Sequence, residues 1–193
     1  MDDAVRAAMA KWPDVPAVFG WLSLDARGRW RVSGTVIEHA GLTSFIARNY
    51  QADAAGRWYF QNGPQQVFVS LAYTPWVLRL GLDGELTTHT GTPLAHPVAA
   101  WLDDDGHLLI STADAQVGLV HDADLPAAIE RLCNRAGTPT DPATLLDPAH
   151  WPADTGIALA TGWLALSPIR RSAVAPRFGF VPEPQGDDDH CRP

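Results

Sequence analysis

The hydrophobic residues of this chain fall into many short runs, and acidic turns that end on glycine separate several of them. Short apolar or alternating runs are typical of β-strands, whereas an amphipathic helix needs a longer pattern with the helical period. We therefore predict strands at residues 18–24, 30–32, 58–61, 67–71, 76–80, 86–89, 99–102, 108–111 and 117–120, and closing strands at 157–166 and 178–181.

Helical spacing is rarer along the chain. Residues 2–12 carry apolar residues at helical intervals, and Pro13 ends this helix because proline has no amide hydrogen to donate. Two further helices are expected at 41–50 and 123–135, with Gly137 as the C-cap of the second. Hairpins outnumber helices and no regular alternation of strand and helix occurs, so the predicted fold class is α+β with mainly antiparallel sheets.

One arrangement occurs twice. Trp21-Leu22 and Trp101-Leu102 each begin a strand that an acidic turn joins to a second strand, and the pattern Leu-x-x-x-Ile-x-Arg follows at 42–48 and 125–131. Such a recurrence indicates a duplicated unit. We predict two related β-hairpin/helix repeats packed into one compact body. The predicted parts are an N-terminal helix and lead-in (1–17), a first α+β unit (18–98), a second α+β unit (99–181) and a flexible acidic tail (182–193).

Bulk properties exclude several classes of protein. The formal net charge is −8, so we expect neither nucleic acid nor a membrane as a partner. The arginines at 170, 171 and 177 are interpreted as a solvated strand face. No apolar run approaches the ~20 residues that span a bilayer, and the acidic N-terminus is unlike a signal peptide, so a cytoplasmic location is expected. Two cysteines provide no disulfide framework.

Residues that could carry chemistry do not form a familiar constellation. No histidine pair has the spacing of metal ligands, and no phosphate-binding loop occurs, so no metal and no cofactor is predicted. His39 and His121 precede predicted helices at equivalent places in the two repeats, where a histidine packs against the first turn or faces solvent. Cys133 has the spacing of a core residue, and the acidic run at 103–105 is interpreted as a solvated turn. No catalytic residues are predicted.

The order of elements resembles an uncharacterised bacterial family, domain of unknown function 1285 (DUF1285). The resemblance extends over roughly residues 19–133, and residues 138–155, which are rich in proline, depart from it. It implies two packed α+β repeats and a part in signalling, with no catalytic residues to transfer. It rests on Asp25-Ala26-Arg27-Gly28-Arg29-Trp30, Leu42-Thr43-Ser44-Phe45-Ile46, Gly56-Arg57-Trp58-Tyr59-Phe60, Gln66-Val67-Phe68-Val69, Tyr73-Thr74-Pro75-Trp76 and the later helix near Leu125.

One segment combines a helix end, a hairpin tip and aromatic rings beside amides, as a small-molecule or peptide site requires. Its candidate ligand-binding residues are Arg48, Asn49, Tyr50, Gln61, Asn62, Gln65, Tyr73 and Trp76. The alternative is that the amides serve the hairpin and the rings serve the core. We predict a non-catalytic binding or regulatory module for a small molecule or a protein partner. A small enzyme such as a hydrolase, with a site assembled only in three dimensions, is the alternative, and an obligate homodimer is a third hypothesis.

Overall fold

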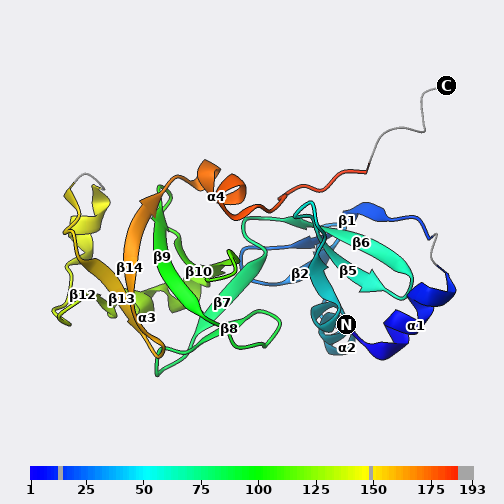
Figure 1. Ribbon diagram of the computed structural model, residues 1–193, viewed down its shortest axis with the longest axis horizontal. Helices are drawn as coiled ribbons and strands as arrows, with labels where there is room; N and C mark the ends of the chain where they lie inside the picture. The colour runs from blue at the N-terminus through cyan, green and yellow to red at the C-terminus, as the bar shows by residue number, and fades with distance from the viewer. Residues whose placement is uncertain (13–14, 148–149, 187–193) are drawn as a thin grey trace. The chain divides into compact units, whose positions relative to one another are not determined.

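The structure is a computed structural model that describes residues 1–12, 15–147 and 150–186 (Figure 1). Contacts between residues divide the chain into two compact units, each built on one β-sheet. Unit 1 comprises residues 1–75 and the C-terminal residues from Gly179, and unit 2 comprises Trp76–Phe178. Residues 76–98, which the sequence assigns to the first unit, therefore lie in unit 2.

Unit 1 is built on a six-stranded sheet in the order β3-β2-β1-β6-β5-β4. Strands β1 and β6 run parallel, and the other neighbours are antiparallel. The elements of unit 1 are α1 (Asp3–Lys11), β1 (Val18–Leu24), β2 (Trp30–Val32), β3 (Thr35–Val36), α2 (Ala40–Arg48), β4 (Tyr50–Ala52), β5 (Trp58–Asn62) and β6 (Gln65–Leu71).

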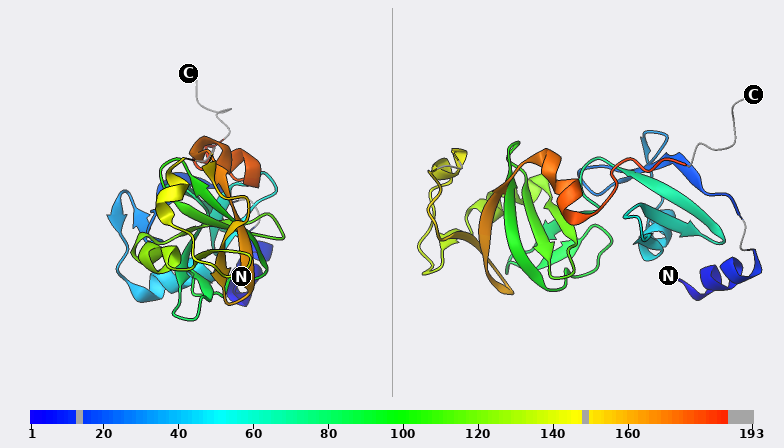
Figure 2. Two further views of the ribbon diagram at one scale, coloured as in Figure 1. Left: turned by 90° about the vertical axis from the view of Figure 1, so that its left-hand side faces the viewer. Right: turned by 45° about the horizontal axis from the view of Figure 1, so that its top comes forward.

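Unit 2 is built on an eight-stranded sheet in the order β12-β13-β14-β9-β10-β11-β7-β8. Figure 2 shows how strongly the long strands of this sheet curve. Its elements are β7 (Trp76–Leu80), β8 (Leu86–Thr88), β9 (Pro97–Asp103), β10 (Leu108–Thr112), β11 (Val117–Val120), the 3-10 helix η1 (Asp122–Asp124), α3 (Leu125–Ile129), β12 (Leu132–Asn134), the 3-10 helix η2 (Pro142–Leu146), β13 (Thr155–Leu159), β14 (Gly162–Ile169) and α4 (Arg171–Phe178).

The fold class is α+β, with sheets whose strands are mostly antiparallel, as the sequence predicts. The two sheets also share a pairing pattern. The order β3-β2-β1-β6-β5-β4 in unit 1 corresponds to β11-β10-β9-β14-β13-β12 in unit 2, and the parallel pairs β1/β6 and β9/β14 occupy the same central place. In unit 2, β7 and β8 extend the sheet beyond β11. That the units arose by duplication stays a prediction.

Four tight turns of the two sheets have one construction. In each, the side-chain Oδ1 of the first residue accepts the main-chain N–H groups two and four residues later, at 2.7–3.0 Å. A glycine with positive φ closes each turn, a conformation that glycine adopts without a steric penalty. These four turns begin at Asp25, Asp53, Asp103 and Asn134.

The helix predicted at 123–135 is wrong in its second half. Helix α3 ends at Ile129, and Leu132–Asn134 form β12, where Leu132 pairs with Ile157. The Asn134 side chain fixes the following turn, so Gly137 closes a turn and does not cap a helix. Cys133 is buried as predicted, but in a strand.

The C-terminal predictions need two corrections. The single strand predicted at 157–166 is the hairpin β13–β14, in which Leu159 pairs with Gly162 across the turn. The strand predicted at 178–181 is wrong, because Phe178 ends helix α4. The arginines at 170, 171 and 177 therefore belong to the approach and body of this helix and do not form a strand face.

The first part of the predicted tail packs on unit 1. The main-chain N–H of Leu71 donates to the carbonyl oxygen of Pro182 at 2.8 Å, and Pro184 is buried. The remainder of that prediction, 187–193, lies outside the described residues. None of the helices in the described ranges is both long and apolar enough to cross a bilayer.

Candidate ligand-binding site

The residues of the predicted site serve several different local contacts. Asn49 is 1% exposed, and its Oδ1 accepts the main-chain N–H of Asp2 at 2.8 Å while its Nδ2 donates to the carbonyl of Phe45 at 2.9 Å. The Arg48 guanidinium lies 3.3 Å from the Asp2 carboxylate. Both residues therefore fasten the start of α1 to the end of α2.

The hairpin amides are also engaged within unit 1. Gln61 is buried, and its Nε2 donates to the carbonyl of Gly63 at 2.9 Å, whereas its Oε1 has no hydrogen-bond partner among the described residues. The Gln65 side chain donates to the carbonyl of Pro16 at 3.2 Å. Asn62 is exposed at the tip of the β5–β6 hairpin.

The aromatic members of the predicted site lie in different units. Tyr50 and Tyr73 are buried in unit 1, and the Tyr50 hydroxyl donates to the carbonyl of Pro75 at 3.1 Å. Burial raises the pKa of Tyr50 well above its usual value. Trp76 belongs to unit 2 and donates to Gln116 Oε1 at 3.0 Å. These contacts support structural roles, and ligand binding by the eight residues stays a prediction.

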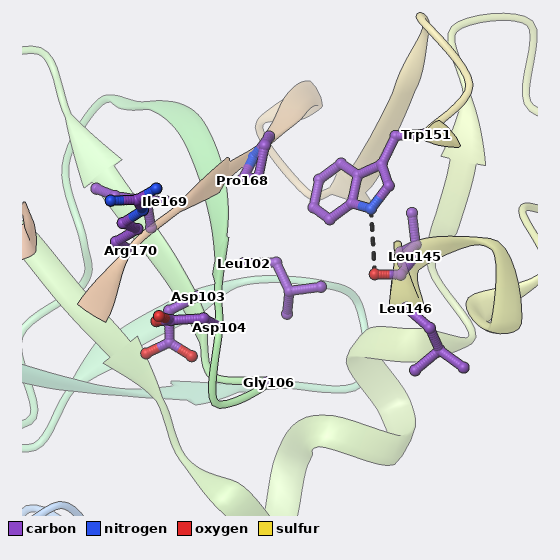
Figure 3. Close-up of a pocket in the computed structure, with 10 residues that line it drawn as sticks. All are labelled: Leu102, Asp103, Asp104, Gly106, Leu145, Leu146, Trp151, Pro168, Ile169 and Arg170. Atoms are coloured by element: carbon purple, nitrogen blue, oxygen red, sulfur yellow. Dashed lines mark hydrogen bonds between the residues drawn. The ribbon is translucent and has the colours of Figure 1, made fainter. Parts of the chain in front are cut away.

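Unit 2 contains two adjoining cavities that the sequence pattern does not reveal. The larger, of about 630 Å³, lies between the end of β9, the end of β14 and the segment around η2 (Figure 3). The smaller, of about 200 Å³, continues toward α3 and the core of unit 2. Leu102, Gly106, Leu145 and Leu146 line both cavities, so the two cavities adjoin, and we call them together the unit-2 cavity.

The segment between β12 and β13 supplies one wall of this cavity. Asp141 Oδ1 accepts the main-chain N–H of Ala143 at 2.9 Å and so begins the short helix η2. The buried side chain of Leu145 lines both cavities, and Leu146 lines them while remaining 86% exposed. Trp151 Nε1 donates to the carbonyl of Leu145 at 3.1 Å, which fixes the indole beside the wall (Figure 3).

Charged side chains gather at the opposite end, on the β9–β10 turn. The Asp103 carboxylate is buried, accepts the N–H groups of Asp105 and His107, and lies 3.0 Å from the His107 ring nitrogen Nδ1. Asp104 accepts the main-chain N–H of Arg171 at 2.7 Å. This hydrogen bond, with the charges of both neighbouring arginines, holds the pKa of Asp104 below its usual value.

Strand register places Arg170 at the same end. Ile169, the last residue of β14, pairs with Asp103, the last residue of β9, so Arg170 follows directly beside Asp104. The Arg170 side chain is exposed and lines the larger cavity. No hydrogen bond or ion pair joins its guanidinium to another described residue, although its charge acts on Asp104.

Other candidate chemistry has structural uses. The ring nitrogen Nδ1 of His39 accepts the N–H of Leu42 at 3.1 Å, and that of His121 accepts the N–H of Ala123 at 3.0 Å. Each histidine therefore caps the start of a helical segment, one in each unit. Within residues 1–12, 15–147 and 150–186, no three His, Cys, Asp or Glu side chains gather as a metal site would require.

Sequence reasoning missed the unit-2 cavity because its walls come from four separated segments. The one available signal was the proline-rich stretch at 138–155, which departs from the pattern of the remaining chain and supplies Leu145, Leu146 and Trp151. Arg170 carried no local signal, because its place depends on the pairing of β14 with β9.

Comparison with known structures shows a shared fold. A DUF1285 family protein from Silicibacter pomeroyi DSS-3, solved at 2.50 Å, matches with a TM-score of 0.53 and 13% identity, over 86% of this chain and 96% of that chain. A DUF1285 family protein from Shewanella baltica OS155, solved at 1.40 Å, matches with a TM-score of 0.42 and 16% identity, over 55% of this chain and 87% of that chain. The match to the Silicibacter pomeroyi protein confirms the predicted resemblance to DUF1285 proteins.

Sequence comparison gives a family without an assigned activity. No curated protein matches the chain significantly. Residues 1–185 match the family DUF2944, which is described as "Protein of unknown function (DUF2946)". Because this match extends over nearly the whole chain, the protein belongs to the DUF2944 family, whose function is unknown.

Proposed function

We propose that the protein is a non-catalytic binding or regulatory module whose ligand is an apolar small molecule held in the unit-2 cavity. The observation that carries this proposal is the pair of adjoining cavities, which have Leu102, Gly106, Leu145 and Leu146 in common. Small-molecule sites are typically concave, largely apolar spaces with a few placed polar groups, and their volumes are on the order of 300–1,000 Å³.

The walls support an apolar ligand more than a polar one. The smaller cavity is lined by leucine, isoleucine, alanine, proline and glycine residues, so a polar group placed there would lose its hydration without finding a partner. Apolar side chains at the mouth point to the same chemistry, since Leu146 and Ile129 are 86% and 45% exposed. A ligand that covers them would remove apolar surface from water.

Fluorescence of N-phenyl-1-naphthylamine, a neutral dye that brightens in apolar surroundings, tests this proposal. We expect the protein to bind the dye and Leu146→Asp to weaken binding about fivefold, because part of an apolar wall is replaced by a carboxylate. Leu82→Asp is the matched control, since Leu82 is also an exposed leucine of unit 2 but does not line the cavity. Absence of dye binding, or an equal loss in both variants, would refute the proposal.

A small hydrolase is the second candidate, and the pair formed by His107 and Asp103 at the edge of the cavity is the observation that favours it. The pair also has a structural explanation. In the turns that begin at Asp25 and Asp53, an arginine four residues later contacts the aspartate in the same way, at 2.8 Å in both. Hydrolysis of p-nitrophenyl butyrate that is lost in His107→Gln would favour the enzyme over the binding module.

A further inference from the structure

Resting on the binding role proposed above, we infer that the unit-2 cavity takes a linear alkyl chain that ends in a single anionic group. The chain lies in the apolar part of the cavity, and the anion pairs with the guanidinium of Arg170. Medium-chain carboxylates are the simplest molecules of this class.

The apolar and polar walls of the unit-2 cavity lie at separate ends. The apolar end is formed by residues of α3, β12 and η2, such as Ala128, Leu132 and Leu145. The charged residues of the larger cavity, Asp103, Asp104 and Arg170, all lie on the β9–β10 turn or directly after β14 (Figure 3). A ligand that matches both ends has an apolar body and one polar terminus.

The two aspartates at the charged end already have hydrogen-bond partners. Both oxygens of Asp103 face N–H groups of the turn or the His107 ring. Asp104 accepts the N–H of Arg171 and lies near the positive charges of Arg170 and Arg171. A cationic terminus would therefore approach two hydrogen-bonded carboxylates, and two arginines lie near the Asp104 carboxylate.

The guanidinium of Arg170 has N–H donors available for a ligand. A guanidinium presents five N–H donors and matches a carboxylate with two parallel hydrogen bonds. No hydrogen bond or ion pair joins the Arg170 guanidinium to a described residue, and its side chain is exposed beside the cavity. An anionic terminus that arrives through the cavity would meet these donors without breaking an existing contact.

Displacement of the dye by three ten-carbon probes below their micelle concentrations tests the inference. The probes are decanoate, 1-decanol and decyltrimethylammonium, which share one chain and differ in terminal charge. We expect decanoate to bind about tenfold more tightly than decanol, since a charge-assisted hydrogen bond is stronger than a neutral one. Octanoate should bind about fourfold more weakly for each methylene removed, if its chain lies in the apolar part.

Arg170→Gln is the decisive variant. It should remove the preference for decanoate over decanol, which is a ratio of two affinities measured on the same variant, because the guanidinium that would pair with the carboxylate is gone. Arg135→Gln is the matched control, since Arg135 is an exposed arginine of the same unit that stacks on Trp163 and does not line the cavity.

The outcomes separate the inference from the proposed function. Dye binding with decanoate no stronger than decanol, or with decyltrimethylammonium strongest, overturns the anionic terminus and leaves the binding role standing. A preference for decanoate that survives in Arg170→Gln overturns the assignment to Arg170, and so does an equal loss of the preference in Arg135→Gln. If the dye does not bind, the proposed function falls, and the inference that rests on it falls as well.

Discussion

Protonation of His89 is expected to destabilise unit 2 in mild acid. His89 directly follows β8, and its ring nitrogen Nε2 is shielded from solvent. Its other nitrogen, Nδ1, accepts the main-chain N–H of Val77 at 3.3 Å, an arrangement that requires the neutral ring. Burial lowers the pKa of His89 from 6.5 to about 4. His89→Asn removes the titrating group while keeping a side-chain oxygen that can accept a hydrogen bond.

The size of the effect follows from the difference between the two pKa values. Between pH 6.5 and pH 4 the unfolded chain binds a proton at His89 that the folded protein does not, so the free energy of unfolding falls as the pH falls. The stability that the neutral His89 ring contributes is fully present above pH 6.5, and no further stability is lost at His89 below about pH 4. The whole shift corresponds to about 3 kcal/mol, of which about 2 kcal/mol is lost by pH 5.

Urea unfolding at pH 7.5 and pH 5, followed by tryptophan fluorescence, measures this contribution. The natural protein should lose about 2 kcal/mol more between the two pH values than His89→Asn does. His96→Asn is the control, because His96 is exposed and asparagine accepts its positive φ of 49°. If His89→Asn keeps the full pH dependence, the ring is not held neutral by burial and the reasoning fails.

Two further predictions concern the turns of unit 1. Asp53→Ala should lower the free energy of unfolding by about 2 kcal/mol, because two main-chain N–H groups lose their acceptor. Asp53→Asn should keep most of the stability, because an asparagine side-chain oxygen accepts the same two N–H groups, as Asn134 does in unit 2. Equal losses by urea titration would contradict this. Gly56→Ala should lower the melting temperature more than Gly34→Ala, because both have positive φ but only a Cβ at Gly56 would lie 2.0 Å from the carbonyl oxygen of Gly179. Similar melting temperatures of the two variants would contradict this, because they would show that the chain around Gly179 moves away from the new Cβ at no cost in stability.

Local chemistry was enough to predict the hairpins. An aspartate that precedes a glycine by three residues specifies a turn by itself, because the side chain accepts the turn's own N–H groups. The strands on either side of Asp25 and Asp103 were therefore predictable to within a few residues. The same reasoning located β7, since the run 76–80 is bounded by Pro75 and by the turn at 81–84.

Pairing partners far along the chain decided what local pattern could not. Leu132 and Cys133 continue the apolar spacing of α3, so the sequence favours a longer helix. In the structure they pair with Ile157 and Gly156 of β13. The hydrogen bonds of this strand pair come from residues more than twenty positions away, which no local window contains. The unit-2 cavity was hidden for the same reason, because the parallel pairing of β9 with β14 assembles its charged end.

The two units differ at equivalent places of their sheets, and the differences form the unit-2 cavity. Leu24 pairs with Leu71 in unit 1, and Leu102 pairs with Pro168 in unit 2, so two residues beyond these partners Tyr73 corresponds to Arg170. Tyr73 is buried, whereas Arg170 is exposed beside a cavity.

The connections that follow β4 in unit 1 and β12 in unit 2 differ as well. In unit 1 a tight turn joins Ala52 to Trp58, whereas in unit 2 the chain from Asn134 to Thr155 includes η2 and Trp151. This longer connection supplies apolar residues to one wall of the unit-2 cavity. Arg170, which stands directly after β14 at the place of Tyr73, supplies the positive charge. The same sheet topology therefore places a buried tyrosine at this position in one unit and an arginine beside an amphipathic cavity in the other. On this argument, replacing 138–154 by a tight turn would abolish dye binding while leaving the pairing of β9 with β14 intact.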